Sequence, residues 1–446
     1  FVIFVLQTET HMKYALIAIS AVAISFCSNA QLSFSDTQDK PVPVSPEPST
    51  GLENIYVIRS SAGMTISFHT GEAVKWSRFG SNGAAYAEEI GVSESISLGS
   101  EDCGYVVETG GRSHYYWIVN YSNHRLQLNS ITPAANQQDC SMTELDVDGS
   151  GDRIVCYTIN GRGVEISRDL KLSYNTLAYD ADNGTYSQTE TVQTIPYIRP
   201  VITVDAPYCN TTFTLSGDRF LEEWKAGQTV ESMPYSTVSV SAETTAEQTE
   251  RDNDNEQTAA GASLGGSAPC EITFSAAITD AVSFHEWQLA RNPEFDPIDD
   301  RYTQTDLTYT FREQGTVYVR FFAADASGQC EYFSPSYEVT IGESSLLCPN
   351  AFSPQSSPGV NDEWKVSYKS IISFDCHIFN RWGTEIFSFT DPSIGWDGKY
   401  KGKYVPAGTY YYVIKARGAD GRDYKLSGDI NIINAKNINE SGPVTD

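Results

Sequence analysis

Three aspartates between residues 146 and 152 have the spacing of the first half of a calcium loop. In the segment DVDGSGD, Asp146, Asp148 and Asp152 belong to a run of oxygen-bearing side chains at alternate positions, with a glycine at the sixth. An EF-hand also needs a bidentate acid at position twelve, and Tyr157 stands there. A turn between two strands explains the two glycines equally well, and we favour the turn. Calcium is the single candidate ligand, and we expect no other cofactor.

Residues that could act as nucleophiles or general bases do not form a recognisable catalytic pattern. No histidine lies in an H-E-x-x-H segment or recurs at another metal-ligand spacing. Cys103 and His114 would make a thiol–imidazole pair, but an oxidised cysteine supplies no nucleophile. Carboxylate pairs for glycoside hydrolysis stay open, because 57 acidic residues produce many chance pairs. We therefore predict a protein that is not an enzyme.

Four aromatic residues, Trp76, Tyr115, Tyr116 and Trp117, could form a flat platform for sugar rings. Aromatic side chains in β-rich modules more often fill the core, because they bury a large apolar surface. Both interpretations are kept, with the core favoured.

The beginning of the chain has the pattern of a secretory signal. Lys13 follows Met12, an apolar run extends from Tyr14 to Phe26, and small residues at Ser28 and Ala30 suit a cleavage site. The apolar run is too short for a membrane-spanning helix, and we predict no transmembrane segment elsewhere. The mature chain is expected to begin at Gln31, after the upstream residues and signal of 1–30.

An exported chain changes how its cysteines are interpreted. After loss of Cys27 an even number remains, and an oxidising compartment favours disulfides over thiol chemistry. We predict two local bridges, Cys270–Cys330 and Cys348–Cys376. The other four are expected to pair among themselves, with open connectivity: Cys103, Cys140, Cys156 and Cys209.

The elements that position these residues are predicted to be short β-strands. Runs rich in Val, Ile, Thr and Tyr recur between Gly, Ser and Asn turns, which is typical of β-sandwiches. We predict an all-β fold of tandem, immunoglobulin-like β-sandwich modules that ends in a small β-sandwich. The expected parts after the signal are a Pro-rich tether (31–50), two β-sandwich modules (51–134 and 135–240), an acidic disordered linker (241–267), a third module (268–344), a C-terminal domain (345–434) and a tail (435–446).

The third module places Cys270 before Trp287, then a strand over residues 317–323, then Cys330. This order resembles immunoglobulin-like and PKD-like modules. Cys330 follows the strand instead of lying within it, so the usual bridge between the two sheets is not reproduced.

The C-terminal domain contains six motifs in order over about 85 residues. It resembles the gliding-motility-associated C-terminal domain, the type B sorting domain of the type IX secretion system of Bacteroidetes. The matching residues are Pro349, Asn350, Phe352, Pro354, Gly359, Asn361, Asp362, Phe379, Asn380, Arg381, Trp382, Gly383, Trp396, Asp397, Gly398, Pro406, Gly408, Tyr410, Gly428 and Asp429.

This resemblance implies that the type IX translocon and outer-membrane shuttle proteins are partners of the domain. It also implies that the protein reaches the cell surface or the extracellular space through the periplasm. We expect Trp382 and Trp396 to fill the domain's core, and Asp362 and Asp397 to accept backbone hydrogen bonds in turns. The sequence departs from the family in the loop at 355–358, which lacks a carboxylate, and in its continuation to residue 446.

The formal net charge of −27 lies entirely in residues 1–345, because 11 Lys and Arg balance 11 Asp and Glu over residues 346–446. Such an acidic chain is unsuited to nucleic acid, whose phosphates need a basic surface. We expect a secreted surface protein whose residues 31–345 act as spacers or bind an unknown surface partner. The alternatives are an accessory or signalling component of the secretion and gliding apparatus, and a secreted hydrolase without a visible linear motif.

Overall fold

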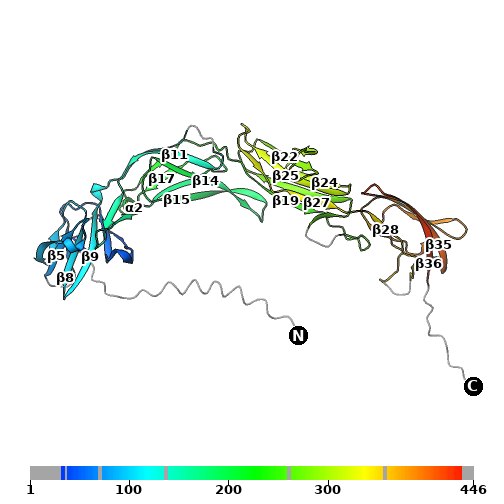
Figure 1. Ribbon diagram of the computed structural model, residues 1–446, viewed down its shortest axis with the longest axis horizontal. Helices are drawn as coiled ribbons and strands as arrows, with labels where there is room; N and C mark the ends of the chain where they lie inside the picture. Colours follow the sequence, from blue (N-terminus) through cyan, green and yellow to red (C-terminus); the bar gives the residue numbers. More distant parts are fainter. Residues whose placement is uncertain are drawn as a thin grey trace, which may run out of the picture.

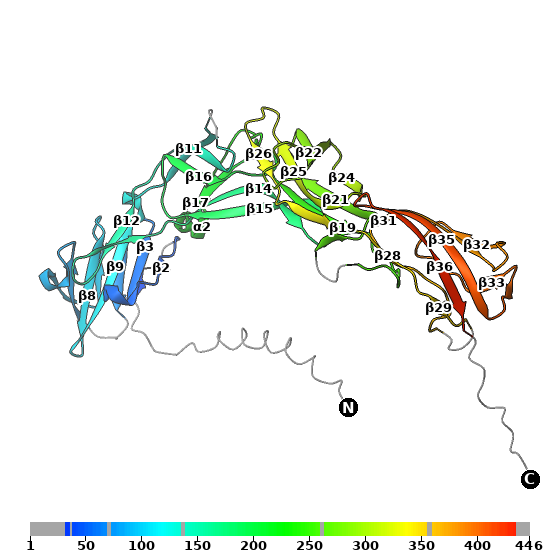
Figure 2. The same cartoon turned by 45° about the vertical axis from the view of Figure 1, so that its right-hand side comes forward.

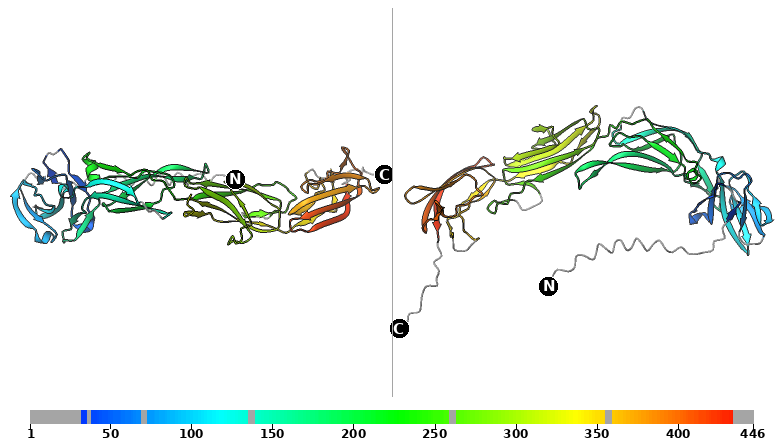
Figure 3. Two further views of the ribbon diagram at one scale, coloured as in Figure 1. Left: turned by 90° about the horizontal axis from the view of Figure 1, so that it is seen from above. Right: turned by 180° about the vertical axis from the view of Figure 1, so that it is seen from behind.

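The computed structural model describes residues 32–35, 38–68, 73–134, 139–258, 263–354 and 359–433. Four β modules follow one another in a row, which bends into an arc when seen from the side (Figures 1 and 2). From above, the row is narrow and nearly straight (Figure 3). The predicted all-β tandem β-sandwich fold is confirmed. The predicted signal peptide and the C-terminal tail lie outside the described residues.

The first module consists of a three-stranded sheet, β1-β4-β7, and a six-stranded sheet, β2-β3-β9-β8-β5-β6. Leu32 pairs with Phe68, and Val42 pairs with Val57. The prediction of a tether over 31–50 is therefore wrong, since two strands of the module lie within it. The elements are β1 (Leu32–Phe34), β2 (Val42–Val44), β3 (Asn54–Ile58), β4 (Thr65–Phe68), β5 (Val74–Phe79), β6 (Glu88–Ser93), β7 (Ser95–Ser97), β8 (Cys103–Thr109) and β9 (Arg112–Asn120), with short 3-10 turns η1 (Pro48–Thr50), η2 (Ala84–Tyr86) and η3 (Tyr121–Asn123).

The second module has sheets β10-β11-β16 and β15-β14-β17-β18, and the hairpin β12-β13. One continuous cluster of buried apolar side chains runs from Leu52 of the first module to Tyr235 of the second. These two modules therefore share part of their core. The elements are β10 (Gln127–Pro133), β11 (Met142–Ser150), β12 (Ile154–Tyr157), β13 (Gly163–Ile166), β14 (Leu170–Asp180), β15 (Thr185–Ile195), β16 (Val201–Asp205), β17 (Thr214–Gly217), α2 (Arg219–Glu223) and β18 (Gln228–Glu231).

The third module is a sandwich of the sheet β19-β21-β24 on the sheet β20-β27-β25-β22-β23, with β26 paired to β25. Trp287 lies at its centre, 5.0 Å from the Phe321 ring and 5.5 Å from the Phe274 ring. The elements are β19 (Ala242–Gln248), β20 (Leu264–Gly266), β21 (Cys270–Ile278), β22 (Phe284–Ala290), β23 (Asp300–Tyr302), β24 (Asp306–Phe311), β25 (Gly315–Ala324), β26 (Glu331–Phe333) and β27 (Tyr337–Ile341).

The predicted acidic disordered linker over 241–267 is wrong. Strand β19 pairs with β21 over its full length, from Ala242 opposite Ile278 to Gln248 opposite Ile272. It is the edge strand of its sheet, and Ala242 is its single fully buried residue. An edge strand with a solvated face tolerates Glu, Thr and Gln, so its composition resembles that of a disordered segment.

The fourth module combines the five-stranded sheet β29-β36-β35-β31-β32 with the pairs β28-β30 and β33-β34. Its core surrounds Trp364, Trp396 and Ile414, all fully buried. The longest hairpin of this module consists of β35 and β36, paired from Gly408 opposite Ile432 to Arg417 opposite Asp423. The elements are β28 (Ser345–Leu347), β29 (Ala351–Phe352), β30 (Ser367–Lys369), β31 (Ile371–Phe379), β32 (Glu385–Phe389), β33 (Lys399–Tyr400), β34 (Lys403–Tyr404), β35 (Gly408–Gly418) and β36 (Asp423–Ile432).

The cysteines correct the predicted bridges. Cys140 of the second module bonds to Cys330 of the third, with Cα atoms 5.5 Å apart, so Cys270–Cys330 is wrong. Cys348 and Cys376 are both free thiols, and the bridge predicted between them is absent. Cys103, Cys156 and Cys209 are also free, so the expected pairing among the remaining four is wrong as well. The observed disulfide joins two modules, whereas the predictions assumed bridges within one module.

Among the described residues, no helix has the length and apolar character needed to span a bilayer.

Candidate recognition sites

The aspartates that suggested calcium lie on a strand and not in a loop. Asp146 and Asp148 are exposed residues of β11, and Asp152 follows its end. Asp148 accepts a hydrogen bond from Asn129 on the neighbouring strand β10, at 3.1 Å. The favoured turn interpretation holds for Gly151, which lies in the connection of 151–153 between β11 and β12. It is wrong for Gly149, which belongs to β11 and where a Cβ would lie 2.6 Å from the Gln127 carbonyl oxygen. Within the described parts of the chain, no group of three or more metal-ligating side chains comes together.

The structure separates the candidate thiol–imidazole pair. Cys103 lies opposite Ile118 in the sheet, whereas His114 contacts the Glu53 carboxylate at 2.7 Å and the Phe68 ring. Burial raises the pKa of the Cys103 thiol, and it raises that of Cys156 to about 11. These thiols therefore stay protonated at neutral pH and are poor nucleophiles.

Sequence analysis missed one formal match to a catalytic motif. Residues 261–265 read G-A-S-L-G, the spacing of a nucleophile elbow. An elbow places its serine on a turn from a strand into a helix. Here Ser263 precedes the strand β20, and the chain continues into β21. The local structure is therefore not that of an elbow.

The aromatic platform is part of the core. Trp76, Tyr116 and Trp117 are almost completely buried in the first module, as the favoured interpretation predicted. The Trp117 ring packs 5.7 Å from Phe79, and Trp76 donates its indole N–H to the Ser93 carbonyl at 3.0 Å. These rings are not accessible to a sugar.

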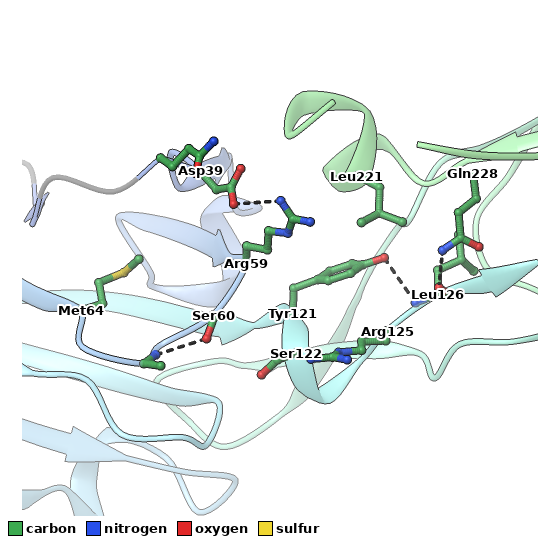
Figure 4. A pocket seen from close by; sticks show the side chains of 12 residues that line it. Asp39, Arg59, Ser60, Met64, Tyr121, Ser122, Arg125, Leu126, Leu221 and Gln228 are labelled. Atoms are coloured by element: carbon green, nitrogen blue, oxygen red, sulfur yellow. Dashed lines mark hydrogen bonds and ion pairs between the residues drawn. The ribbon is translucent and has the colours of Figure 1, made fainter. Parts of the chain in front are cut away.

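A cavity of about 560 Å³ lies where the first and second modules meet (Figure 4). Arg59 and Asp39 form an ion pair of 2.9 Å on one side, and Leu221 of α2 lies on the other. Between them lies Tyr121, whose hydroxyl donates to Asp218 at 3.0 Å and accepts from the Leu126 amide at 3.4 Å. Burial raises the pKa of Tyr121, and the Asp218 carboxylate adds to the rise. Tyr121 is thus a fixed, neutral part of the module junction and not a general base.

Behind this cavity, a fully buried ion pair of the second module bonds to Tyr121 of the first. Arg168 donates from Nε to Asp218 at 2.9 Å, and from Nη2 to Tyr121 at 3.2 Å and to the His124 carbonyl at 2.6 Å. Its Nη1 donates to the Asp152 carbonyl at 2.7 Å. Asp218 also caps α2 through the Leu221 amide, at 3.1 Å. Each charge is therefore paired and hydrogen-bonded, as burial requires.

Most motif residues of the C-terminal domain have structural roles. Trp396 is buried as predicted, and it packs 5.4 Å from both Phe352 and Tyr410. Asp397 accepts the Lys399 amide at 3.0 Å, which confirms its predicted role. Gly398 has φ +75°, and a Cβ there would lie 2.9 Å from Cγ of Pro354. These residues hold the turn after Trp396 against the beginning of the domain.

The first motifs attach the start of the domain to its last strand. The Pro349 carbonyl accepts the Trp364 indole N–H at 2.6 Å, and the Asn350 carbonyl accepts the Asn431 amide at 2.9 Å. Phe352 pairs with Ile432 in parallel register. Other motif residues have local roles. Asp362 accepts the Gly359 amide as predicted, and Asp429 accepts a hydrogen bond from Asn431. Asn361 has φ +55°, and Gly428 leaves room for the Tyr412 hydroxyl.

One motif forms an exposed turn between β31 and β32. Phe379 ends β31, and the Asn380 side chain accepts the amides of Trp382 at 2.9 Å and Thr384 at 3.0 Å. Gly383 closes the turn with φ +79°. Trp382 is 74% exposed, so its predicted place in the core is wrong. Sequence reasoning had no signal for this, because composition does not distinguish a core tryptophan from a binding tryptophan.

The exposed turn borders a pocket of about 330 Å³. The Arg381 guanidinium stands over the Trp382 ring, 4.3 Å from its centre. Pro406 and Gly408 also line the pocket, and the Tyr410 hydroxyl donates to the Pro406 carbonyl at 2.9 Å. Burial raises the pKa of Tyr410 and Arg381 only partly opposes this, so the hydroxyl stays protonated. The site offers an indole face and a cation, but no acid–base pair.

Comparisons with known proteins identify two domains. Residues 346–432 match the CHU_C type IX secretion signal domain, and residues 132–232 match a fibronectin type III domain. No curated protein matches the chain significantly.

Three similar solved structures illustrate the range of the matches. A tetra-tandem repeat in the extending region of a large adhesion protein is 11% identical, over 83% of this chain and 95% of that chain, with a TM-score of 0.20. Fibronectin(III)-like modules of Clostridium thermocellum CbhA are 14% identical, over 39% and 93%, with a TM-score of 0.18. Dimeric latent PorU from Porphyromonas gingivalis is 10% identical, over 72% and 35%, with a TM-score of 0.15. These TM-scores are too low to support an argument.

The predicted sorting domain is therefore confirmed by its family match, and it indicates export to the cell surface or the extracellular space. The chain carries a type IX secretion signal domain of the CHU_C family at residues 346–432, preceded by a fibronectin type III domain at residues 132–232.

Proposed function

We propose that this chain is a non-enzymatic surface protein whose sorting domain binds the type IX translocon through the pocket beside Trp382. In this proposal, the three front modules form a stiff spacer that also presents the binding surface for an external partner. The observation that carries the proposal is the exposed turn at residues 380–383: it belongs to a sorting motif, yet its indole contributes almost nothing to the core.

The chemistry of the pocket suits a protein interface. Tryptophan and arginine are the residues that most often dominate binding energy, since each combines a large apolar contact area with directed hydrogen bonding. The exposed turn presents both residue types, because the Arg381 guanidinium lies over the Trp382 ring. The guanidinium N–H groups can then donate to an acceptor of the partner. We expect the partner segment to supply an apolar side chain and a carboxylate.

The spacer role is supported by how the front modules are joined. The first two share a hydrophobic cluster, and Tyr121 of the first bonds to a buried ion pair of the second. The second and third are linked by the Cys140–Cys330 disulfide. Such junctions restrict bending, so the modules keep the extended arc of Figure 1. The candidate catalytic side chains are buried, lie apart from their expected partners or form structural hydrogen bonds.

The test is secretion of Trp382→Ala in a host with the type IX system. We expect export to fall at least about tenfold, because truncating an interface tryptophan typically costs about 2 kcal/mol or more of binding energy. The substituted protein should accumulate in the periplasm. Tyr411→Ala is the matched control, because Tyr411 is also an exposed aromatic of this domain, at 47%, but does not line the pocket.

Wild-type export of Trp382→Ala would reject the pocket as the recognition site. A glycan or peptide hydrolysed by the purified front modules would instead reject the non-enzymatic role, and leave the export route untouched.

A further inference from the structure

The segment after β19 leaves the third module and contacts the sorting domain. We refer to residues 251–257 as the strap. The Gln257 amide donates to the Tyr368 carbonyl at 2.7 Å, and the Tyr368 amide donates to the Asn255 carbonyl at 3.1 Å. Glu256 is thereby bridged to Tyr368 in parallel orientation. Strand β30 is paired with β28 on one side, so the strap occupies its other edge.

Side chains of the strap add to these backbone bonds. The Asn255 amide donates to two carbonyls of the sorting domain, Val366 and Pro392, at 2.8 Å each. Gln257 donates to the Ser367 hydroxyl at 2.8 Å. Asp254 lies 3.2 Å from the Lys365 ammonium. The contact is therefore specific to this edge, and it uses neutral amides more than charge.

A buried carboxylate fixes the shape of the strap. The Glu256 side chain is fully buried and accepts from Arg251 at 2.7 Å and from Asn253 at 3.1 Å. The Tyr368 hydroxyl of the sorting domain donates to the same carboxylate at 3.3 Å. Because Arg251 also donates to the Ser267 carbonyl at 2.9 Å, the strap is anchored in its own module at the same point.

Two further contacts from other parts of the third module flank the strap. The Ser370 amide donates to the Ser267 hydroxyl at 2.8 Å, and the Gln314 amide donates to the Ala419 carbonyl at 3.0 Å. By contrast, the covalent connection consists of residues 342–344, between the end of β27 and the start of β28. The third module thus holds the sorting domain at three polar contacts besides this connection, and Ile372 and Ala419 of the sorting domain also pack against its core.

We propose that the strap keeps the sorting domain bound to the third module after the connection at residues 342–344 is cut. The two pieces would then remain one non-covalent complex, and release of the sorting domain would require the strap to detach as well as a peptide bond to be hydrolysed. The surface involved is the free edge of β30, and its occupant is the strap of the same chain. This inference goes beyond export, and its test does not depend on the pocket at Trp382.

The test inserts a recognition sequence for a specific protease, flanked by Gly-Ser, between Glu343 and Ser344 of the full mature chain. After complete cleavage, size-exclusion chromatography at about 1 µM should show both pieces eluting together. With Asn255→Ala and Gln257→Ala combined, we expect at least a tenfold larger fraction of free sorting domain. The matched control is Gln127→Ala with Asn129→Ala, which removes the same two side-chain types from the exposed edge of the second module.

Separation of the two pieces with the unsubstituted strap would overturn the proposal by itself. Equal retention by the strap variant and its control would also overturn it, because the flanking contacts alone would then hold the domain. Circular dichroism of the uncut proteins checks that the variants are folded, so that a separated piece reports a lost contact.

Discussion

The junction between the first and second modules is built around a shared hydrophobic cluster, whereas the junction between the third module and the sorting domain is built mainly from the amide hydrogen bonds of the strap. Arg168 and Asp218 are completely removed from solvent and lie beside a shared hydrophobic cluster. The strap also buries one carboxylate, that of Glu256, but its Asp254 and Gln257 are exposed. Both junctions are specific, but they differ in how easily water can replace their contacts when the two modules separate.

This difference bears on which junction can open. Opening the first junction would expose the shared apolar cluster and remove Tyr121 from a buried charge pair, so this junction is maintained as a whole or lost with the fold. Amide hydrogen bonds near the surface exchange for bonds to water at a small net cost. The first junction is therefore suited to a permanent spacer, and the last to a contact that can open.

The largest effect is expected from breaking the buried pair. Arg168→Met leaves Asp218 charged and unpaired, which should lower the free energy of unfolding of the first two modules by about 3–5 kcal/mol. Urea denaturation, with hydrogen exchange to assign each transition to a module, measures this. Lys171→Met is the control: its exposed pair with Glu222, at 3.1 Å, should contribute less than about 1 kcal/mol. Equal losses for the two variants would remove the distinction between the junctions.

A smaller loss is expected at the intermediate junction. Cys140→Ser removes the disulfide between the second and third modules, and loss of a native disulfide typically costs about 2–4 kcal/mol. Hydrogen exchange should rise on both sides of the junction and leave the first module unchanged. Cys209→Ala, which removes a buried thiol without a bond, is the control. Non-reducing mass spectrometry that found Cys330 linked to Cys270 would contradict the observed pairing.

The smallest effect is expected from acid pH, at the junction between the third module and the sorting domain. Burial opposes ionisation of Asp420, but hydrogen bonds from Ser344 and from the Arg422 amide outweigh burial and lower its pKa. A carboxylate with a lowered pKa stabilises the folded state at neutral pH, and this contribution is lost as the pH falls through the folded pKa.

As the pH falls below about 4, the ordinary pKa of an aspartate, the contacts of Ser344 with Asp420 should therefore weaken, by less than about 1 kcal/mol since the group is only half-buried. Asp420→Asn should remove the pH dependence in hydrogen exchange of residues 343–347. An unchanged acid response in that variant would assign the effect to another group.

Particular residues show how far sequence reasoning reached. The hairpin of β35 and β36 was predictable, because alternation along a strand fixes which side chains point inward. Burial of the aromatic segment at 115–117 was predictable from its large apolar area, since the neighbours Tyr116 and Trp117 are buried in different clusters. The six sorting motifs located the last domain, since their order over one stretch of chain is itself specific. Trp396 could be placed in the core, yet the same reasoning misplaced Trp382. A tryptophan is apolar in either position, and only the turn held by Asn380 directs this one outward.

The sequence by itself determined an all-β chain with a type IX sorting domain at its end, because strand periodicity, turn residues and the motifs are all local features. The tertiary structure alone decided which cysteines bond, which charges meet and where the polar segment after β19 belongs. Cys140 and Cys330 are 190 residues apart, and the strap reaches Tyr368 from more than a hundred residues upstream. Contacts of that kind depend on how whole modules are placed beside one another, and no local pattern of residues specifies that placement.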